Sequence, residues 1–291
     1  MCWMRGDPVA LDAAWARDLA SWAIPPAILD AAPESPYGFP SELFARRGDR
    51  AAAGDGRAVP TPTTARALEA LVEPGAVLDV GVGGGATSLP LAARCTRLIA
   101  VDGQIDMLEA VTARAADLGL PVTSVFGRWP DVAPDTPRAE VAVCGHVAYN
   151  VPELGDFLRA LSAHARRRVV IELTERHPLS WMNDLWVRFH ELERPEQPSA
   201  DDAEALCGAL GFDARRDERV DTADTAGSGF ERRGDAIALV RRRLCLTPER
   251  DDDIAAALGS RLHEHAGLWG AGPYEQRVIT LWWEPAGGVG L

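Results

Sequence analysis

The sequence predicts an α/β protein built on a doubly wound sheet, with helical additions around it. From residue 63 onward, short apolar runs alternate with helical stretches, which is the pattern of parallel strands joined by crossover helices. One apolar run leads directly into a glycine-rich turn at residues 81–85, as in α/β sheets that bind a cofactor. The 291 residues, 47% of them hydrophobic, are enough for one large core and one cover.

A separate segment precedes the alternating region. Apolar residues recur at steps of three or four over residues 10–23 and predict an amphipathic helix that ends before two prolines. Residues 33–62 are rich in Pro, Gly and Arg, so we predict a loop there with a short helix at 41–46. The expected organisation is a helical cap at residues 1–60 and a main domain at residues 61–291.

The main domain begins with five predicted strands joined by helices. The apolar runs that predict the strands cover residues 76–80, 98–101, 121–126, 140–144 and 169–173. The stretches with helical character lie near residues 86–94, 105–118 and 153–165. Strands connected in this way form a doubly wound sheet.

The elements after the fifth strand are less regular. We predict a tryptophan-bearing helix, a second helix and a sixth strand, near residues 180–192, 200–210 and 212–219. Two further helices at 231–245 and 249–266 would form a helical insertion over 231–266, although Ala236 to Leu246 also fits a strand. The final apolar run, residues 277–283, predicts a last strand.

The composition argues against several classes of protein. A net charge of -13 opposes nucleic-acid binding, which needs clustered basic residues. The five cysteines never form a CxxC pair and the six histidines lack ligand spacing, so we expect a reducing compartment and no metal. No apolar run approaches the roughly 20 residues of a membrane helix, and the start lacks a signal-peptide core. We expect a cytoplasmic protein without a membrane partner.

The glycine turn has the surroundings of a cofactor site. The sequence VLDVGVGGGATSLPLAA predicts a strand, a turn with four glycines, and a helix from about Ala86. Glycines allow a ligand to approach the backbone closely. Asp102 follows at the end of the next predicted strand, where a carboxylate can accept hydrogen bonds from two ribose hydroxyls. These features predict a cofactor that contains adenosine.

Two cofactors fit this turn, because Gly81 to Ala86 also satisfies the dinucleotide pattern GxGxx(G/A). Asp79 distinguishes them, since a negative charge at the strand end suits the ammonium of an amino acid better than a pyrophosphate. The turn also lies well inside the chain, whereas many dinucleotide domains begin with it. The sequence therefore favours S-adenosylmethionine over a nicotinamide cofactor.

An acid followed by GxGxG resembles motif I of the class I S-adenosylmethionine-dependent methyltransferases. The resemblance covers roughly residues 60–220 and 275–284. It implies a Rossmann-like sheet of seven strands whose last strand, residues 277–283, is antiparallel. It also implies which residues bind the cofactor: Asp79, Gly81, Val82, Gly83 and Gly85 for the methionine part, Asp102 for the ribose, and Gly103, Gln104 and Met107 beside the adenine.

Three later segments extend the resemblance. After the third strand the family often has an acid for the adenine amino group, but here Asp131 is displaced, and Gly127, Arg128 and Trp129 stand in that segment. Trp129 would either stack on adenine or pack in the core. Residues 143–151 resemble the family segment beside the transferable methyl, which adds His146 to the cofactor residues. Residues 172–190 resemble a bacterial branch of the family to which we can attach no acceptor.

Candidate catalytic residues follow the predicted strands. Methyl transfer needs mainly alignment of the acceptor, and it needs a base only if the nucleophile starts protonated. His146, Tyr149, Glu172 and His177 are the candidates, with backbone hydrogen bonding, core packing or pairing with arginine as their structural alternatives. His177 and His190 flank a helix whose aromatic residues would hold a planar or cationic substrate or would pack in the core.

The sequence thus predicts a methyltransferase that acts on an oxygen or nitrogen atom of a small-molecule acceptor, such as a secondary metabolite. The alternatives are an NAD(P)-dependent oxidoreductase and a non-catalytic S-adenosylmethionine-binding protein. We expect the N-terminal cap and the insertion to cover the acceptor. The oligomeric state stays open, with a homodimer as one alternative.

Overall fold

The computed structural model describes residues 6–37, 49, 60–222 and 229–286. The short helix expected at 41–46 lies outside the described residues. Among the described residues, no helix is both long enough and apolar enough to cross a membrane.

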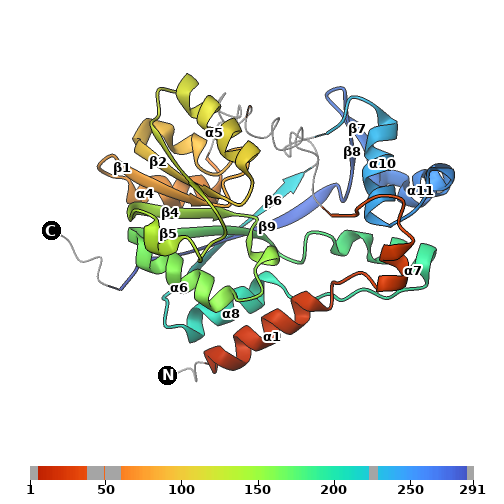
Figure 1. Ribbon diagram of the computed structural model, residues 1–291, viewed down its shortest axis with the longest axis horizontal. Helices are drawn as coiled ribbons and strands as arrows, with labels where there is room; N and C mark the ends of the chain where they lie inside the picture. Colours follow the sequence, from red (N-terminus) through yellow and green to blue (C-terminus); the bar gives the residue numbers. More distant parts are fainter. Residues whose placement is uncertain (1–5, 38–48, 50–59, 223–228, 287–291) are drawn as a thin grey trace.

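A seven-stranded sheet forms the centre of the molecule, in the order β3-β2-β1-β4-β5-β9-β6 (Figure 1). Strands β1 to β5 run parallel to one another, and β9 runs antiparallel to both β5 and β6. The strands are β1 (Gly75–Val80), β2 (Cys95–Asp102), β3 (Val122–Phe126), β4 (Ala139–Gly145), β5 (Ala165–Thr174), β6 (Arg215–Thr222) and β9 (Glu275–Trp283). This arrangement confirms the doubly wound sheet and its antiparallel last strand.

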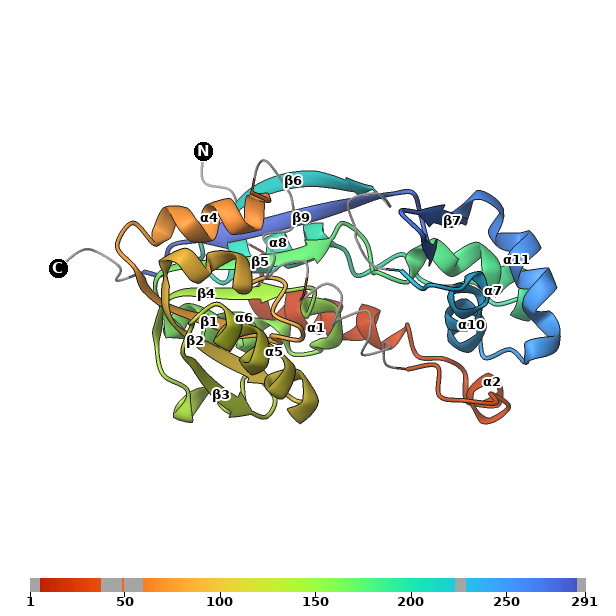
Figure 2. The same cartoon turned by 90° about the horizontal axis from the view of Figure 1, so that it is seen from above.

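Helices cover both faces of the sheet. On one face, α4 (Pro62–Ala70) and α5 (Ile105–Asp117) bury apolar side chains against the inner strands. On the other face lie α6 (Leu154–His164), α8 (Ala200–Ala209) and α1 (Pro8–Ala20) (Figure 2). The single-turn 3-10 helices between these elements are η2 (Ala133–Asp135), η3 (Ala148–Asn150), η5 (Pro248–Arg250) and η6 (Gly259–Arg261).

The N-terminal helix belongs to the main core, although the sequence placed it in a cap. Asp7 caps α1 by accepting a hydrogen bond from the Val9 amide, and the helix packs against α6 and α8. Trp15 is 1% exposed and donates its indole N–H to the Val151 carbonyl at 2.8 Å. The boundary between main domain and cap therefore falls after α1.

A smaller unit with its own core lies beside the sheet, and we call it the cap. Its members share a third cluster of buried apolar residues. They are α2 (Pro26–Asp30), η4 (Ser180–Met182), α7 (Asn183–His190), α10 (Arg233–Arg243), α11 (Asp251–Leu258) and the hairpin β7 (Leu262–His265) and β8 (Leu268–Ala271). Strand β9 enters the sheet directly from this unit (Figure 1).

Four details of the sequence prediction need correction. The helix expected at 86–94 is the 3-10 helix η1 (Leu89–Arg94). A helix that began at Ala86 would need a Pro90 N–H for its bond to the Ala86 carbonyl, and proline has none. The helix expected over 249–266 ends at Leu258, and Gly259, with φ of 54°, turns the chain toward the hairpin. Residues 236–243 are helical, which excludes the strand alternative for that stretch. The sixth strand begins at Arg215 rather than 212.

Candidate cofactor and acceptor site

The glycine turn lies where β1 ends, at the centre of the sheet. Gly81, Gly83 and Gly85 all have positive φ, at 72°, 48° and 84°. A Cβ on Gly81 would lie 2.4 Å from the Val147 side chain, so this position requires glycine. The Val82 side chain packs into the core, which leaves only its backbone on the turn. The turn is thus held against the segment that follows β4.

Asp79 is a buried acidic residue near the end of β1. Its side chain is 1% exposed, and neither carboxylate oxygen has a hydrogen-bond partner among the described residues. Burial raises the pKa of this carboxyl from 3.8 to about 7; the nearby Ser88 hydroxyl opposes this rise, and the negative charge of Asp102 adds to it. A buried carboxylate without a partner fits the ammonium of S-adenosylmethionine, whereas the pyrophosphate of a dinucleotide would repel it.

Asp102 connects the turn to the next helix. One carboxylate oxygen accepts the Gly83 amide and the other accepts the Gln104 amide, both at 2.9 Å. Each carboxylate oxygen can accept a second bond, so Asp102 retains capacity for ribose hydroxyls. Gly103 and Gln104 are exposed beside it, and Met107 is buried in the first turn of α5. These are the positions that the resemblance assigns to the ribose and adenine.

The structure has an apolar groove beside Asp102 that the sequence analysis did not predict. Ile105 and Phe126 are each 62% exposed, and Phe126 lies directly opposite Asp102 in the pairing of β2 with β3. They line a groove of about 570 Å³ between α5 and β3. A flat apolar surface at this point suits an adenine ring. The feature of the sequence that could have indicated this groove is Phe126, an aromatic residue at the last position of a predicted strand.

Trp129 packs in the core. It is 7% exposed, donates its indole N–H to the Phe157 carbonyl at 3.3 Å, and meets His164 edge-on at 4.9 Å. This corrects the stacking alternative, because the ring has no free face for adenine. Gly127, with φ of 146°, turns the chain before it, and Arg128 is exposed.

His146 and Glu172 form a pair at the C-terminal ends of β4 and β5. The His146 Nε2 lies 3.0 Å from a Glu172 carboxylate oxygen, and the His146 amide donates to the Glu172 carbonyl at 2.7 Å. His146 has φ of 60°, a left-handed conformation that is costly for a residue with a Cβ. Its side chain is 38% exposed whereas that of Glu172 is 11% exposed. The pair therefore holds one imidazole at an open edge of the sheet.

Glu172 is fixed by residues far away in the sequence. Arg219 on β6 lies 2.6 Å from the second carboxylate oxygen, and the Thr63 hydroxyl at the start of α4 donates to the same oxygen. Thr63 also contacts the Thr280 hydroxyl at 2.8 Å. Burial alone would raise the pKa of Glu172, but hydrogen bonds and charge from His146 and Arg219 hold it well below its usual range. Glu172 is thus an ionised, immobilised carboxylate.

The structure does not bring Tyr149 and His177 to this pair. Tyr149 is 5% exposed and donates its hydroxyl to the Thr174 carbonyl at 2.8 Å. His177 stacks on Trp22 with ring centroids 3.8 Å apart, and burial, with the nearby charge of Arg194, lowers its pKa to about 3. Both side chains pack against the N-terminal segment, Tyr149 on Trp15 and His177 on Trp22.

The described residues contain no group of three or more His, Cys, Asp or Glu side chains that could hold a metal ion. The cysteines in the described part of the chain are free and buried: Cys95, Cys144, Cys207 and Cys245.

Comparison with known proteins bears on the segment that carries this site. Residues 77–168 match the family described as a methyltransferase domain. An uncharacterized protein from Haemophilus influenzae is 33% identical over 104 residues, which cover 35% of this chain and 38% of that relative.

Similar solved structures include magnesium protoporphyrin IX methyltransferase from Synechocystis with bound S-adenosylhomocysteine, at 15% identity and a TM-score of 0.47, covering 94% of this chain and 98% of that one. The YcgJ protein from Bacillus subtilis has 15% identity and a TM-score of 0.49, covering 76% and 97%. The O-methyltransferase TomG from Streptomyces achromogenes has 14% identity and a TM-score of 0.43, covering 86% and 92%.

The fold and the glycine turn define a doubly wound α/β protein with a site for an adenosine-containing cofactor. The methyltransferase match covers β1 to the start of β5, which includes Asp79, the turn, Asp102 and His146. The antiparallel β9 between β5 and β6 is the seventh strand that the resemblance requires. Over residues 77–168 the chain matches the methyltransferase-domain family, and its fold is a Rossmann-like α/β sheet.

Proposed function

We propose that the protein transfers the methyl group of S-adenosylmethionine to an oxygen or nitrogen atom of a small-molecule acceptor, such as a secondary metabolite. The observation that carries this proposal is the His146–Glu172 pair next to the glycine turn. Gly81 lies against Val147, the neighbour of His146, and a Cβ on Gly145 would lie 2.2 Å from the Thr87 hydroxyl. The imidazole and the cofactor turn therefore share one edge of the sheet.

The pair has the geometry of an oriented general base. A carboxylate only accepts hydrogen bonds, so in the neutral imidazole the ring proton lies on Nε2, facing Glu172. This leaves the Nδ1 lone pair to take a proton from an acceptor hydroxyl or amine. When bound, S-adenosylmethionine supplies an activated methyl group on sulfur. Glu172 fixes the ring, and stabilises it when it becomes charged.

The strand order argues against the oxidoreductase alternative. Dinucleotide-binding sheets have the order 3-2-1-4-5-6, whereas this sheet inserts an antiparallel strand between β5 and β6. A thermal-shift comparison tests the assignment directly. S-adenosylhomocysteine should stabilise the protein and NADH and NADPH should not; stabilisation by the nicotinamides alone would contradict the proposal.

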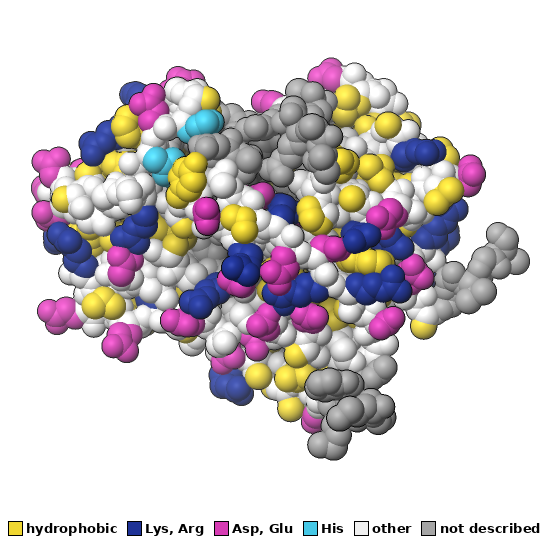
Figure 3. All heavy atoms as spheres, turned by 180° about the vertical axis from the view of Figure 1, so that it is seen from behind, with side chains coloured by type: hydrophobic (Ala, Val, Ile, Leu, Met, Phe, Trp, Pro, Cys, Tyr) yellow, Lys and Arg dark blue, Asp and Glu magenta, His cyan; other side chains and the backbone are white. Residues whose placement is uncertain are grey.

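Transfer itself separates an enzyme from a non-catalytic binding protein. Incubation with methyl-labelled S-adenosylmethionine and fractionated metabolite pools should label a small molecule. Figure 3 shows basic and acidic side chains interspersed over the face in view, which favours a small molecule over nucleic acid.

The free cysteines favour a cytoplasmic location, which cell fractionation would check.

Replacing Asp102 tests the ribose assignment. We expect Asp102→Ala to weaken S-adenosylhomocysteine binding by roughly 10- to 150-fold, because a charge-assisted contact of about 1.5 to 3 kcal/mol is lost. Isothermal titration calorimetry would measure the dissociation constant. Asp106→Ala, an exposed acid in the first turn of α5, is the matched control and should bind normally. An unchanged constant in Asp102→Ala would refute the assignment.

Asp79 should make cofactor binding depend on pH. Because its pKa is raised from 3.8 to about 7, the carboxyl is protonated below neutrality and cannot pair with an ammonium. Affinity for S-adenosylhomocysteine should fall about tenfold per pH unit below about pH 7. Without ligand the sign reverses: ionising a buried Asp79 costs stability, so this contribution declines as pH rises from about 4 to 7. Calorimetry with Asp79→Asn, which should bind weakly at every pH, checks both statements.

A further inference from the structure

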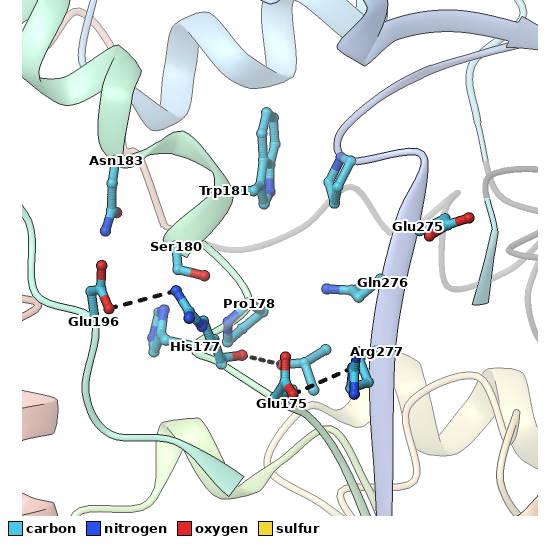
Figure 4. A pocket seen from close by; sticks show the side chains of 13 residues that line it. Glu175, His177, Pro178, Ser180, Trp181, Asn183, Glu196, Glu275, Gln276 and Arg277 are labelled. Atoms are coloured by element: carbon cyan, nitrogen blue, oxygen red, sulfur yellow. Dashed lines mark hydrogen bonds and ion pairs between the residues drawn. The ribbon is translucent and has the colours of Figure 1, made fainter. Parts of the chain in front are cut away.

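We propose that the acceptor is a neutral planar ring compound, bound in a cleft between the cap and the sheet. The inference rests on the proposed function. The cleft has a volume of about 310 Å³, at the lower end for small-ligand sites. It is lined by the chain that follows β5, by η4 and the start of α7, and by the beginning of β9 (Figure 4). The size suits one or two fused rings.

The walls of the cleft are rigid and partly apolar. Trp181 on η4 lines it together with Pro178 and Pro273. Trp181 is only partly buried, so part of its ring stays available to a ligand. Indole and pyrrolidine rings offer flat surfaces that lose little conformational entropy on binding, and aromatic ligands stack on them. Such walls favour a flat molecule over a flexible aliphatic chain.

Two neutral polar side chains reach into the same space. Figure 4 shows Gln276 of β9 and Ser180 of η4 pointing into the gap between the strand and η4. No hydrogen bond is formed by the side chain of either residue within the described structure. An amide and a hydroxyl can each donate and accept, so they would bind hydroxyl or ring-nitrogen groups at the edge of a ring.

The arginine side chains that face the cleft each lie beside a glutamate of opposite charge. Arg176 lies 3.5 Å from Glu196, and Arg277 lies 3.4 Å from Glu175. The remaining lining acid, Glu275, points away from the gap (Figure 4). With each guanidinium already beside a carboxylate, neither an anionic nor a cationic ligand gains an uncompensated partner. This pairing favours a neutral acceptor.

The cleft begins at the end of the strand that carries Glu172. Thr174 lines it, and this residue lies two positions beyond Glu172 on the same face of β5, which is about 7 Å along the strand. A ring seated against Trp181 would extend its polar edge toward His146. The acceptor oxygen or nitrogen forms a bond to the methyl carbon as the sulfur–methyl bond breaks. Sulfur keeps the electron pair, and the acceptor's proton passes to His146.

Ligand-observed NMR on protein saturated with S-adenosylhomocysteine tests the inference without turnover. The probes are catechol and benzimidazole as neutral planar rings, cyclohexanol as the non-planar match, and benzoate and benzylammonium as charged rings. We expect binding of at least one neutral planar ring, at least tenfold tighter than cyclohexanol, benzoate and benzylammonium. Trp181→Ala and Gln276→Leu should each weaken that binding about tenfold or more, whereas Trp269→Ala on β8, outside the cleft, should not.

The outcomes separate the two proposals. If S-adenosylhomocysteine does not bind, the proposed function fails and this inference fails with it. If S-adenosylhomocysteine binds but neither neutral ring does, only the inference is overturned. Equal binding of cyclohexanol or of a charged ring would overturn it as well, as would wild-type affinity in both Trp181→Ala and Gln276→Leu.

Discussion

His146→Gln is expected to lower kcat for methyl transfer by about 100- to 10,000-fold, the usual contribution of a general base. The dissociation constant for S-adenosylhomocysteine should stay within about twofold of wild type, because Asp79, the turn and Asp102 are unchanged. The physical reason lies in the exposed imidazole, which Glu172 orients at 3.0 Å beside the glycine turn. Single-turnover rates with labelled cofactor would measure the chemical step.

A loss of kcat at unchanged cofactor affinity distinguishes a base from a merely structural histidine. His265→Gln is the matched control, because His265 is exposed on the hairpin of the cap. A His146 variant with full kcat would show that the acceptor needs no base from this side chain.

The sheet could be predicted from the sequence because its signals are local. Each inner strand is a short apolar run, and Asp79, the glycines and Asp102 lie at the ends of two such runs. The antiparallel β9 was placed only through the family resemblance. The late start of η1 could have been foreseen, because Pro90 would stand inside a helix that began at Ala86.

The contacts around Glu172 could not be predicted, because they join residues that are far apart in the sequence. Thr63, Arg219 and Thr280 meet Glu172 only after α4, β6 and β9 have assembled around β5. The sequence analysis expected an N-terminal cap and a helical insertion but not their shared core, which joins Ile28 near the N-terminus to residues of α10 and α11. The charge and the hydrophobic periodicity of the sequence do not indicate which distant residues come into contact.

Arg219→Met should destabilise the fold by about 3 to 5 kcal/mol, because it leaves Glu172 as a buried charge without its cation. The side chains of Arg219 and Glu172 are only 14% and 11% exposed, so water cannot replace the lost partner. Urea unfolding at pH 7 would measure the loss. Arg216→Met, on the same strand but paired with more exposed acids, is the control and should cost less than about 1 kcal/mol.

The dependence on pH identifies the cause of this loss. The folded-state pKa of Glu172 is depressed in wild type, so its contribution to stability is present above the pKa of the unfolded chain and is lost as pH falls through the folded value. Removing Arg219 should raise that pKa, and the gap between variant and wild type should narrow from pH 7 to pH 5. The double variant Arg219→Met/Glu172→Gln should regain most of the stability without regaining activity, because no carboxylate then orients His146. An equal loss at both pH values would assign Arg219 to packing instead.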